Sequence, residues 1–220
     1  NKKASGSQID VALITTNRAG TLIRLTMTQK PETDSPLLVC SKIESTEDSS
    51  VTLDTTVPQG ELYYVYAYGS LDRIYTDPAA AVKRADTQTG VVLNRAQQYV
   101  WERGNKKTKL QMNIEDVPES IRTANWKKKE LQDSLGDMGT VIDLTGCTLD
   151  NVLYEVSAQR PVIAKTGENS SVVIVGYDEY NTYLYDPATG QISPYGMNDS
   201  TALFESVGNV FLTYIENVTE

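Results

Sequence analysis

The C-terminal part of the sequence combines one strongly amphipathic helical segment with several short runs of β-branched residues. The apolar residues of 147–158 recur at the spacing of one helix face, Thr148 is placed to cap that helix, and Pro161 ends it. Strand-like runs follow at Val162–Ala164, Ser171–Val175, Thr182–Tyr185 and Val210–Ile215. A short helix capped by Asp199 or Ser200 precedes the last of these runs. Short connections favour antiparallel pairing, so this part predicts an α+β fold.

The first half of the sequence is predicted to be rich in strands. Turn-forming residues separate four runs with β propensity, namely Ile9–Thr16, Thr21–Thr28, Leu37–Ile43 and Ser50–Val57. A unit of strand, helix, strand and strand is then predicted over about residues 61–103, with the helix starting at Asp77-Pro78. Its strands are Glu61–Tyr68, Gly90–Leu93 and Gln98–Glu102. The tyrosines of the first strand form either a packed sheet face or an exposed binding platform.

One further helix is predicted between the two halves. It follows Asp116, and its apolar positions fit one helical face at Ile121, Ala124, Leu131 and Leu135. Gly136 and Gly139 are expected to end it. The polar segment Asn105–Lys109 before it is interpreted as a connector.

The sequence contains no histidine. Hydrolases of the Ser-His-Asp and Cys-His types need an imidazole that exchanges a proton near neutral pH, and His-ligated zinc sites need it as a ligand. Both classes are therefore excluded in their usual form. Neither cysteine belongs to a CxxC motif, and we expect no metal or other cofactor. Asp178-Glu179 lacks the alternating oxygen ligands of a calcium loop and is interpreted as a pair of solvated turn acids.

The net charge of −9 is unevenly distributed along the chain. Residues 131–220 carry −11 and residues 1–130 carry +2, part of it in the run Lys127–Lys129. The acidic C-terminal half would repel phosphates, so nucleic-acid binding is not expected. A hydrophobic content of 40% is ordinary for a globular protein.

Several features favour a location outside the cytoplasm. No run of about 18 apolar residues exists, so no membrane span is expected. The chain begins at Asn1 without an initiator methionine, as expected of a mature or truncated form that has lost a signal or anchor. Tyrosine outnumbers phenylalanine thirteen to two. We expect an extracellular or cell-envelope-attached protein, in which Cys40 and Cys147 form either one disulfide or two free thiols.

The stretch of about 150–190 resembles the C39-like peptidase family, which has a papain-like fold. The family pattern is a helix ending in G-x-P-V-I, then H-x-V-V-V-x-G-Y-D, then a strand closing on D-P or N-P. The matching segments are Arg160–Ala164, Ser170–Asp178 and Tyr183–Pro187. By extension to the terminus, the resemblance covers about 135–220. The resemblance implies a bacterial protein. Residues 111–220 would form a C39-like domain after a β-rich region 1–110. In the alternative division, 61–220 is one papain-like domain.

The resemblance also implies where catalytic groups would lie. The family's histidine falls on Ser170, and its orienting Asp or Asn falls on Asp186. The family's nucleophilic cysteine lies at the start of a helix well upstream, and a loose match places Thr76 at that position. Cys147 lies instead beside the helix that directly precedes the P-V-I strand. A hydroxyl without an adjacent base is a poor nucleophile, and an Asp-Pro pair suits a turn. Ser170 and Asp186 are therefore interpreted as vestigial positions.

Three functions are compatible with these observations. The leading hypothesis is a non-catalytic, exported, peptidase-like protein whose cleft binds or scaffolds a peptide or a cell-envelope ligand. The second is a cysteine hydrolase that uses Cys147 with an atypical base. The third is a surface interaction module that uses the tyrosines of Tyr63–Tyr68.

Overall fold

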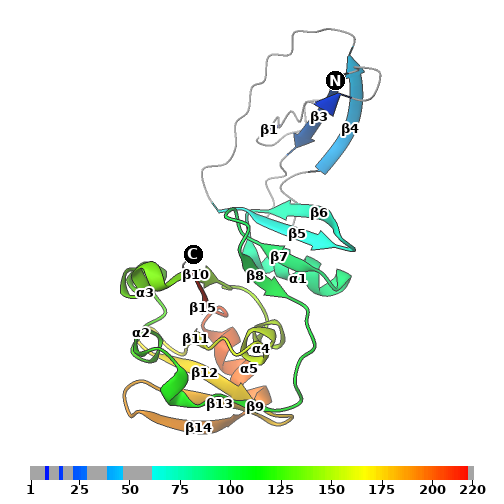
Figure 1. Ribbon diagram of the computed structural model, residues 1–220. Coiled ribbons are helices and arrows are strands. Elements are labelled where there is room, and N and C mark those ends of the chain that lie inside the picture. The colour runs from blue at the N-terminus through cyan, green and yellow to red at the C-terminus, as the bar shows by residue number, and fades with distance from the viewer. Residues whose placement is uncertain (1–7, 10–14, 17–21, 29–38, 47–60, 218–220) are drawn as a thin grey trace.

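The structure is a computed structural model that describes residues 8–9, 15–16, 22–28, 39–46 and 61–217 (Figure 1). Four strand segments are described in the N-terminal part: β1 (Gln8–Ile9), β2 (Thr15–Thr16), β3 (Leu22–Thr28) and β4 (Val39–Thr46). Strands β1, β2 and β4 each pair antiparallel with β3. The predicted strand Ser50–Val57 lies outside the described residues, as does most of Ile9–Thr16.

Residues 61–103 form an antiparallel sheet with a helix on one face (Figure 1). Its elements are β5 (Tyr63–Ala67), β6 (Ser70–Tyr75), α1 (Pro78–Gln88), β7 (Val91–Leu93) and β8 (Tyr99–Glu102), and the strand order is β6-β5-β7-β8. The prediction of a single strand before the helix is wrong, because β6 follows β5 directly. Tyr68 and Gly69, with φ of 52° and 76°, form the tight turn between them. The turn escapes sequence reasoning because Asn or Asp usually precedes the glycine.

Helix α1 confirms the predicted start at Asp77-Pro78. The Asp77 carboxylate accepts a hydrogen bond from the Ala80 backbone N–H at 2.9 Å, and Pro78 occupies the first turn. The helix buries small apolar residues against β5 to β8, namely Ala80, Ala81, Val82 and Ala85. These short side chains let the helix axis lie close to the sheet.

The C-terminal part contains a seven-stranded antiparallel sheet. Its strands are β9 (Leu110–Gln111), β10 (Gly139–Asp143), β11 (Val162–Lys165), β12 (Ser171–Tyr177), β13 (Asn181–Asp186), β14 (Gln191–Gly196) and β15 (Phe211–Glu216). The order is β10-β15-β11-β12-β13-β14, and β9 pairs with the end of β12. The four predicted strands are confirmed as β11, β12, β13 and β15. The sequence pattern misses β9, which is very short, β10, and β14, an exposed edge strand that contains Pro194.

The single helix predicted after Asp116 is wrong, because the segment forms two helices. They are α2 (Glu119–Arg122) and α3 (Lys128–Leu135), with 3₁₀ turns at Ile114–Asp116 and Gly136–Met138. The Asn125 side chain accepts a hydrogen bond from the Lys127 backbone N–H and thereby turns the chain between them. The apolar face is nevertheless largely as predicted, since Ile121, Leu131 and Leu135 are buried.

Helix α4 (Leu149–Ser157) is confirmed with its predicted cap, and the Thr148 hydroxyl accepts from the Asn151 backbone N–H at 3.2 Å. Helix α5 (Met197–Ser206) begins earlier than predicted, after Gly196. The prediction that Asp199 or Ser200 caps it is therefore wrong. The buried Ser200 hydroxyl lies 2.7 Å from the Thr182 hydroxyl and ties α5 to β13 instead.

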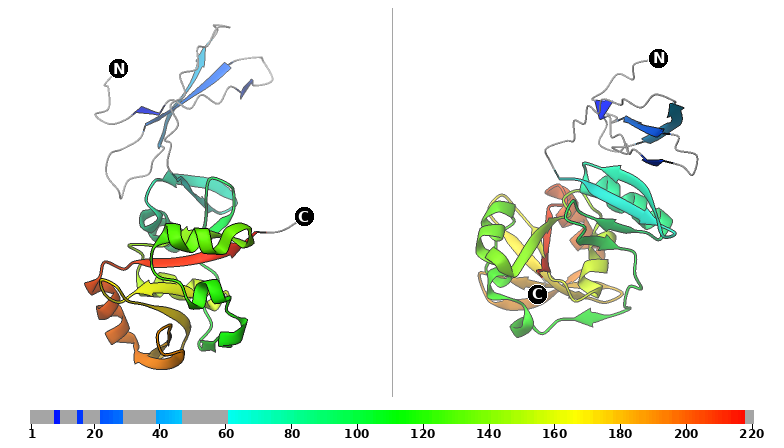
Figure 2. Two further views of the ribbon diagram at one scale, coloured as in Figure 1. Left: turned by 90° about the vertical axis from the view of Figure 1, so that its left-hand side faces the viewer. Right: turned by 45° about the horizontal axis from the view of Figure 1, so that its top comes forward.

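Helices cover both faces of the larger sheet, with α2 and α3 on one side and α4 and α5 on the other (Figure 2). Strand β15 shows this in its alternating side chains. Phe211 makes an edge-to-face contact with Phe204 of α5, whereas Tyr214 lines a hollow with Leu135 of α3. Both faces of β15 are consequently buried, and the α+β class expected from the sequence is confirmed.

The two sheets share one continuous hydrophobic core that extends from Tyr63 to Tyr214. Trp101 of β8 is fully buried at their junction, where its indole N–H donates to the Asn151 backbone oxygen at 2.8 Å and its ring meets Tyr154 of α4 edge-on. Among the described residues, no helix is both long and apolar enough to cross a membrane.

Candidate functional site

Ser170 and Asp186 lie at the same end of the paired strands β12 and β13. Tyr185 pairs with Val173, so Asp186 lies across from Val172, two residues beyond Ser170. The register therefore places the two positions near each other on one strand pair. Neither side chain hydrogen-bonds the other, however, and each has its own local partners.

The local partners of Ser170 and Asp186 are those of turns. The Ser170 hydroxyl accepts from the Thr166 hydroxyl at 3.0 Å, within the exposed loop between β11 and β12. The Asp186 carboxylate accepts from the Ala188 backbone N–H at 2.8 Å and from the Thr189 hydroxyl at 3.1 Å. Asp186 thus stabilises the turn into β14, the arrangement that an Asp-Pro pair favours.

Cys147 is a buried free thiol. Burial raises the pKa of the Cys147 thiol well above its usual range, and the neighbouring carboxylates of Asp77, Glu155 and Asp143 raise it further. An activated cysteine needs the reverse, an electropositive and partly exposed setting. Although Cys147 lies just before the N-cap of α4, its surroundings hold the thiol neutral.

Thr76 is exposed and directly precedes the N-cap of α1. The start of this helix lies against the loop before α4, where a Cβ on Gly146 would come within 3.1 Å of the Ala79 Cβ. Within the described residues, Thr76 makes no hydrogen bond with Ser170, Asp186 or Cys147. The four sequence-derived positions therefore do not form one hydrogen-bonded site.

The tyrosine strand has the two faces that its alternation predicts. Tyr63, Val65 and Ala67 are buried toward α1, whereas Tyr64 and Tyr66 are half-buried on the opposite face. At the turn, Tyr68 is 88% exposed, and the exposed Leu71 lies opposite Tyr66. We call the residues Tyr64, Tyr66, Tyr68 and Leu71 the outer face.

Asp178 uses its carboxylate to shape the hairpin between β12 and β13. One oxygen accepts from the backbone N–H groups of Tyr180 and Asn181, and the other accepts from the Tyr183 hydroxyl at 2.6 Å. The Tyr183 hydrogen bond, followed by the backbone donors, lowers the pKa of Asp178 to about 2. The described residues contain no group of three acids or cysteines able to hold a metal.

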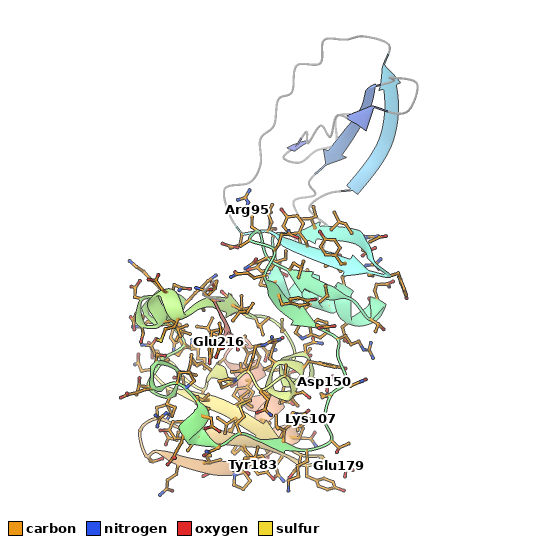
Figure 3. All side chains as sticks on the ribbon, viewed as in Figure 1. Arg95, Lys107, Asp150, Glu179, Tyr183 and Glu216 are labelled. Carbon is orange, nitrogen blue, oxygen red and sulfur yellow. The ribbon has the colours of Figure 1, made fainter. Side chains whose placement is uncertain are left out.

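A cleft of about 820 Å³ opens between β8 and the ends of α4 and β15. We call it the junction cleft. Its lining includes Tyr99 and Glu102 of β8, together with Tyr154, Arg160 and Glu216. Figure 3 labels Glu216 near the level where the two sheets meet. A lining that combines aromatic side chains with a few charged groups is typical of a ligand-binding cleft.

An ion pair joins Arg160, which lines the junction cleft, to the buried Glu155. The Glu155 side chain is only 1% exposed, and its Oε2 accepts from Arg160 Nε at 2.6 Å. Burial raises the pKa of Glu155, and the pairing with Arg160 offsets only part of that effect. The other oxygen, Oε1, has no hydrogen-bond partner.

Sequence reasoning missed the junction cleft because its residues come from β8, α4 and β15. One signal was available, however. Glu155 lies beside the apolar stripe of an otherwise core-facing helix, and Arg160 follows just beyond the end of that helix. A carboxylate in such a position needs a nearby cation when it is buried.

A second groove, of about 660 Å³, runs along the open edge of β10 and is lined also by Tyr63 and Val100. The side-chain amide of Gln132 on α3 covers part of that edge. Gln132 Nε2 donates to the Gly139 backbone oxygen at 3.0 Å, and Oε1 accepts from the Val141 backbone N–H at 2.9 Å. The amide thus occupies the position that a neighbouring strand would otherwise take.

Comparison with known proteins gives a single partial structural likeness to report. No family model matches the sequence, and no curated protein matches it. A solved structure of a "putative C39-like peptidase" from Bacillus anthracis is similar over 41% of this chain, with 18% identity and a TM-score of 0.35. The match covers 57% of that protein, less than two thirds of its length.

Proposed function

We propose that this chain is a non-catalytic protein of the C39-like, papain-like type whose junction cleft binds an extended peptide. The observation that carries the proposal is the local bonding or burial of Ser170, Asp186 and Cys147. Ser170 and Asp186 are bonded within turns, and the Cys147 thiol is buried among carboxylates. Without a histidine, no neutral-pH base of the usual kind is available to activate any of them.

The junction cleft supports binding of a peptide. Its volume of about 820 Å³ lies in the usual range for ligand sites. Strand β8 is at the end of its sheet, so one wall of the cleft is an edge strand. An extended chain gains main-chain hydrogen bonds from such an edge, while pockets select its side chains. Tyr99, which is 51% exposed, offers an aromatic surface for one of them.

We also propose an exported protein of the cell envelope or its surroundings, with the bacterial origin that the resemblance to the C39-like family implies; its ligand is a peptide or an envelope component carrying one. The prevalence of tyrosine over phenylalanine fits this setting. Detection of the natural full-length protein in the envelope or secreted fraction of its cell would support the location. Detection in the cytosol alone would contradict it.

The binding proposal is tested by titrating a library of blocked heptapeptides into the protein and measuring fluorescence anisotropy. Saturable binding is expected, and Tyr99→Ala should weaken it. Tyr195→Ala is a matched control, because Tyr195 is similarly exposed at 42% but belongs to β14 at the far edge of the larger sheet. No saturable binding to the folded protein would refute the proposal.

The outer face supports a second candidate, a surface interaction module. The observation that favours it is the exposed aromatic Tyr68 held at positive φ, a backbone conformation that tyrosine rarely adopts. The same titration separates the two sites. Loss of binding in the Tyr66→Ser, Leu71→Ser double variant, with binding retained in Tyr99→Ala, would assign the ligand to the outer face.

A further inference from the structure

We propose that the junction cleft selects peptides that present a basic side chain, with Glu102 and Glu216 as the anionic partners of that side chain. This inference rests on the proposed peptide-binding function and names the chemistry of its ligand. It is drawn from the distribution of ion pairs around the cleft.

Three cations at or beside the cleft are paired with acids that do not line it. Arg160 pairs with Glu155, whereas Arg103 pairs with Asp86 at 3.3 Å. Lys106 pairs with Asp150. These three cations lie on the cleft wall or on the connector that follows β8, and each is held by a partner on α4 or α1.

Glu102 and Glu216 are left without compensation. Both are exposed, both line the cleft, and neither forms a salt bridge with a described residue. Arg160 is the one cation among the lining residues, and its guanidinium is held by Glu155 behind the wall. The cleft therefore presents two unpaired carboxylates to a ligand, within a C-terminal half that is itself strongly acidic.

The aromatic walls suit a cation as well. Lys106 Nζ lies 5.1 Å from the centre of the Tyr154 ring, so one tyrosine of the cleft already attracts an ammonium group of the chain itself. The ring of Tyr99, which also lines the cleft, is exposed and makes no cation contact among the described residues. A lysine or arginine side chain of the ligand can lie along Tyr99 and place its charge near Glu102.

Glu155 holds the guanidinium of Arg160 and does not itself line the cleft. Its Oε1 atom lacks a donor, although the side chain is almost fully buried. Among the lining residues, an acidic ligand would find no unpaired cation and would face two carboxylates.

The test uses three blocked heptapeptides that differ only at the central residue, which is lysine, norleucine or glutamate. Affinity for the full chain is measured by fluorescence anisotropy at about 50 mM and about 500 mM NaCl, since screening weakens exposed pairs. We expect the lysine peptide to bind about tenfold more tightly than the glutamate peptide at low salt, with the norleucine peptide between them. The preference should shrink at high salt.

Matched charge variants locate the effect. The double variant Glu102→Gln, Glu216→Gln should abolish the preference for lysine. The control Glu168→Gln, Glu179→Gln changes the net charge equally at exposed acids outside the cleft and should keep it. Circular dichroism verifies that each variant is folded.

The possible outcomes separate failure of the lysine preference from failure of peptide binding itself. Equal binding of the three peptides, or a lysine preference that survives in the Glu102→Gln, Glu216→Gln variant, overturns the inference and leaves peptide binding intact. Preference for the glutamate peptide overturns it as well. Absence of binding by all three peptides and by the wider library overturns both proposals.

Discussion

Gln132 provides the most direct test of how the edge of the larger sheet is stabilised. Its side-chain amide makes two hydrogen bonds to β10, to Gly139 and to Val141, in a half-buried position. Gln132→Ala removes both and leaves two backbone groups of the edge strand without a protein partner. We expect lower stability and a greater tendency to self-associate through the exposed edge.

The size of the effect follows from the two lost bonds. A typical hydrogen bond contributes a net stabilisation of about 0.5–1.5 kcal/mol, so the pair contributes about 1–3 kcal/mol. Alanine has a higher helix propensity than glutamine and offsets a few tenths of this loss. With a urea dependence of about 1–3 kcal/mol per M, the midpoint of unfolding should fall by about 1 M.

The assay is urea unfolding followed by circular dichroism, with Ser134→Ala as the control on an exposed position of the same helix. Gln132→Glu is a second probe, because a carboxylate still accepts from the Val141 N–H but cannot donate to the Gly139 oxygen. It should therefore destabilise the fold at neutral pH. A Gln132→Ala midpoint equal to that of Ser134→Ala would refute the reasoning.

Four further predictions concern other parts of the fold. Cys147 should react with iodoacetamide far more slowly in the native protein than in urea, because burial and nearby carboxylates raise its pKa; rapid alkylation below neutral pH would instead support the hydrolase hypothesis. Tyr68→Asn should raise the free energy of unfolding by about 1 kcal/mol, because asparagine tolerates positive φ better, and an unchanged value would contradict this origin of strain. The pKa of Asp178 is lowered in the folded state, so its contribution to stability is present above its unfolded pKa and is lost as the pH falls toward about 2. Asp178→Asn should therefore flatten the acid limb of a curve of stability against pH. An unaltered acid limb would contradict the assignment. We also propose that 61–220 folds as one unit. The fragment 61–220 should then unfold cooperatively, whereas the fragment 111–220, which lacks the buried Trp101, should not. A cooperatively folded 111–220 would favour the two-domain alternative.

The elements predicted from sequence are those whose signal is local. Thr148 and the apolar stripe of α4 identify that helix, and the Asp77-Pro78 pair identifies the start of α1, because caps and helical periodicity act within a few residues. Strands β12 and β13 are recognised for a similar reason. Their β-branched runs are bounded by the turn residues around Asp178.

The missed elements depend on distant partners. Strand β10 is stabilised by β15 and by Gln132 on α3, neither of which its own five residues reveal. The cap predicted at Ser200 fails because that hydroxyl bonds to Thr182, eighteen residues away in sequence. Tertiary contacts override local preference in both cases.

The same distinction explains what the sequence could tell about the candidate site. The absence of histidine is visible in the sequence, and the structure adds that Ser170 and Asp186 each have a turn partner at the same end of one strand pair. The junction cleft has no such local signature, because Glu102 and Glu216 belong to strands of different sheets. Their lack of ion-pair partners becomes visible only when the partners of Arg160, Arg103 and Lys106 are known. A binding preference that arises from uncompensated charge is therefore a property of the assembled fold, which is why paired charge variants test it more sharply than any motif.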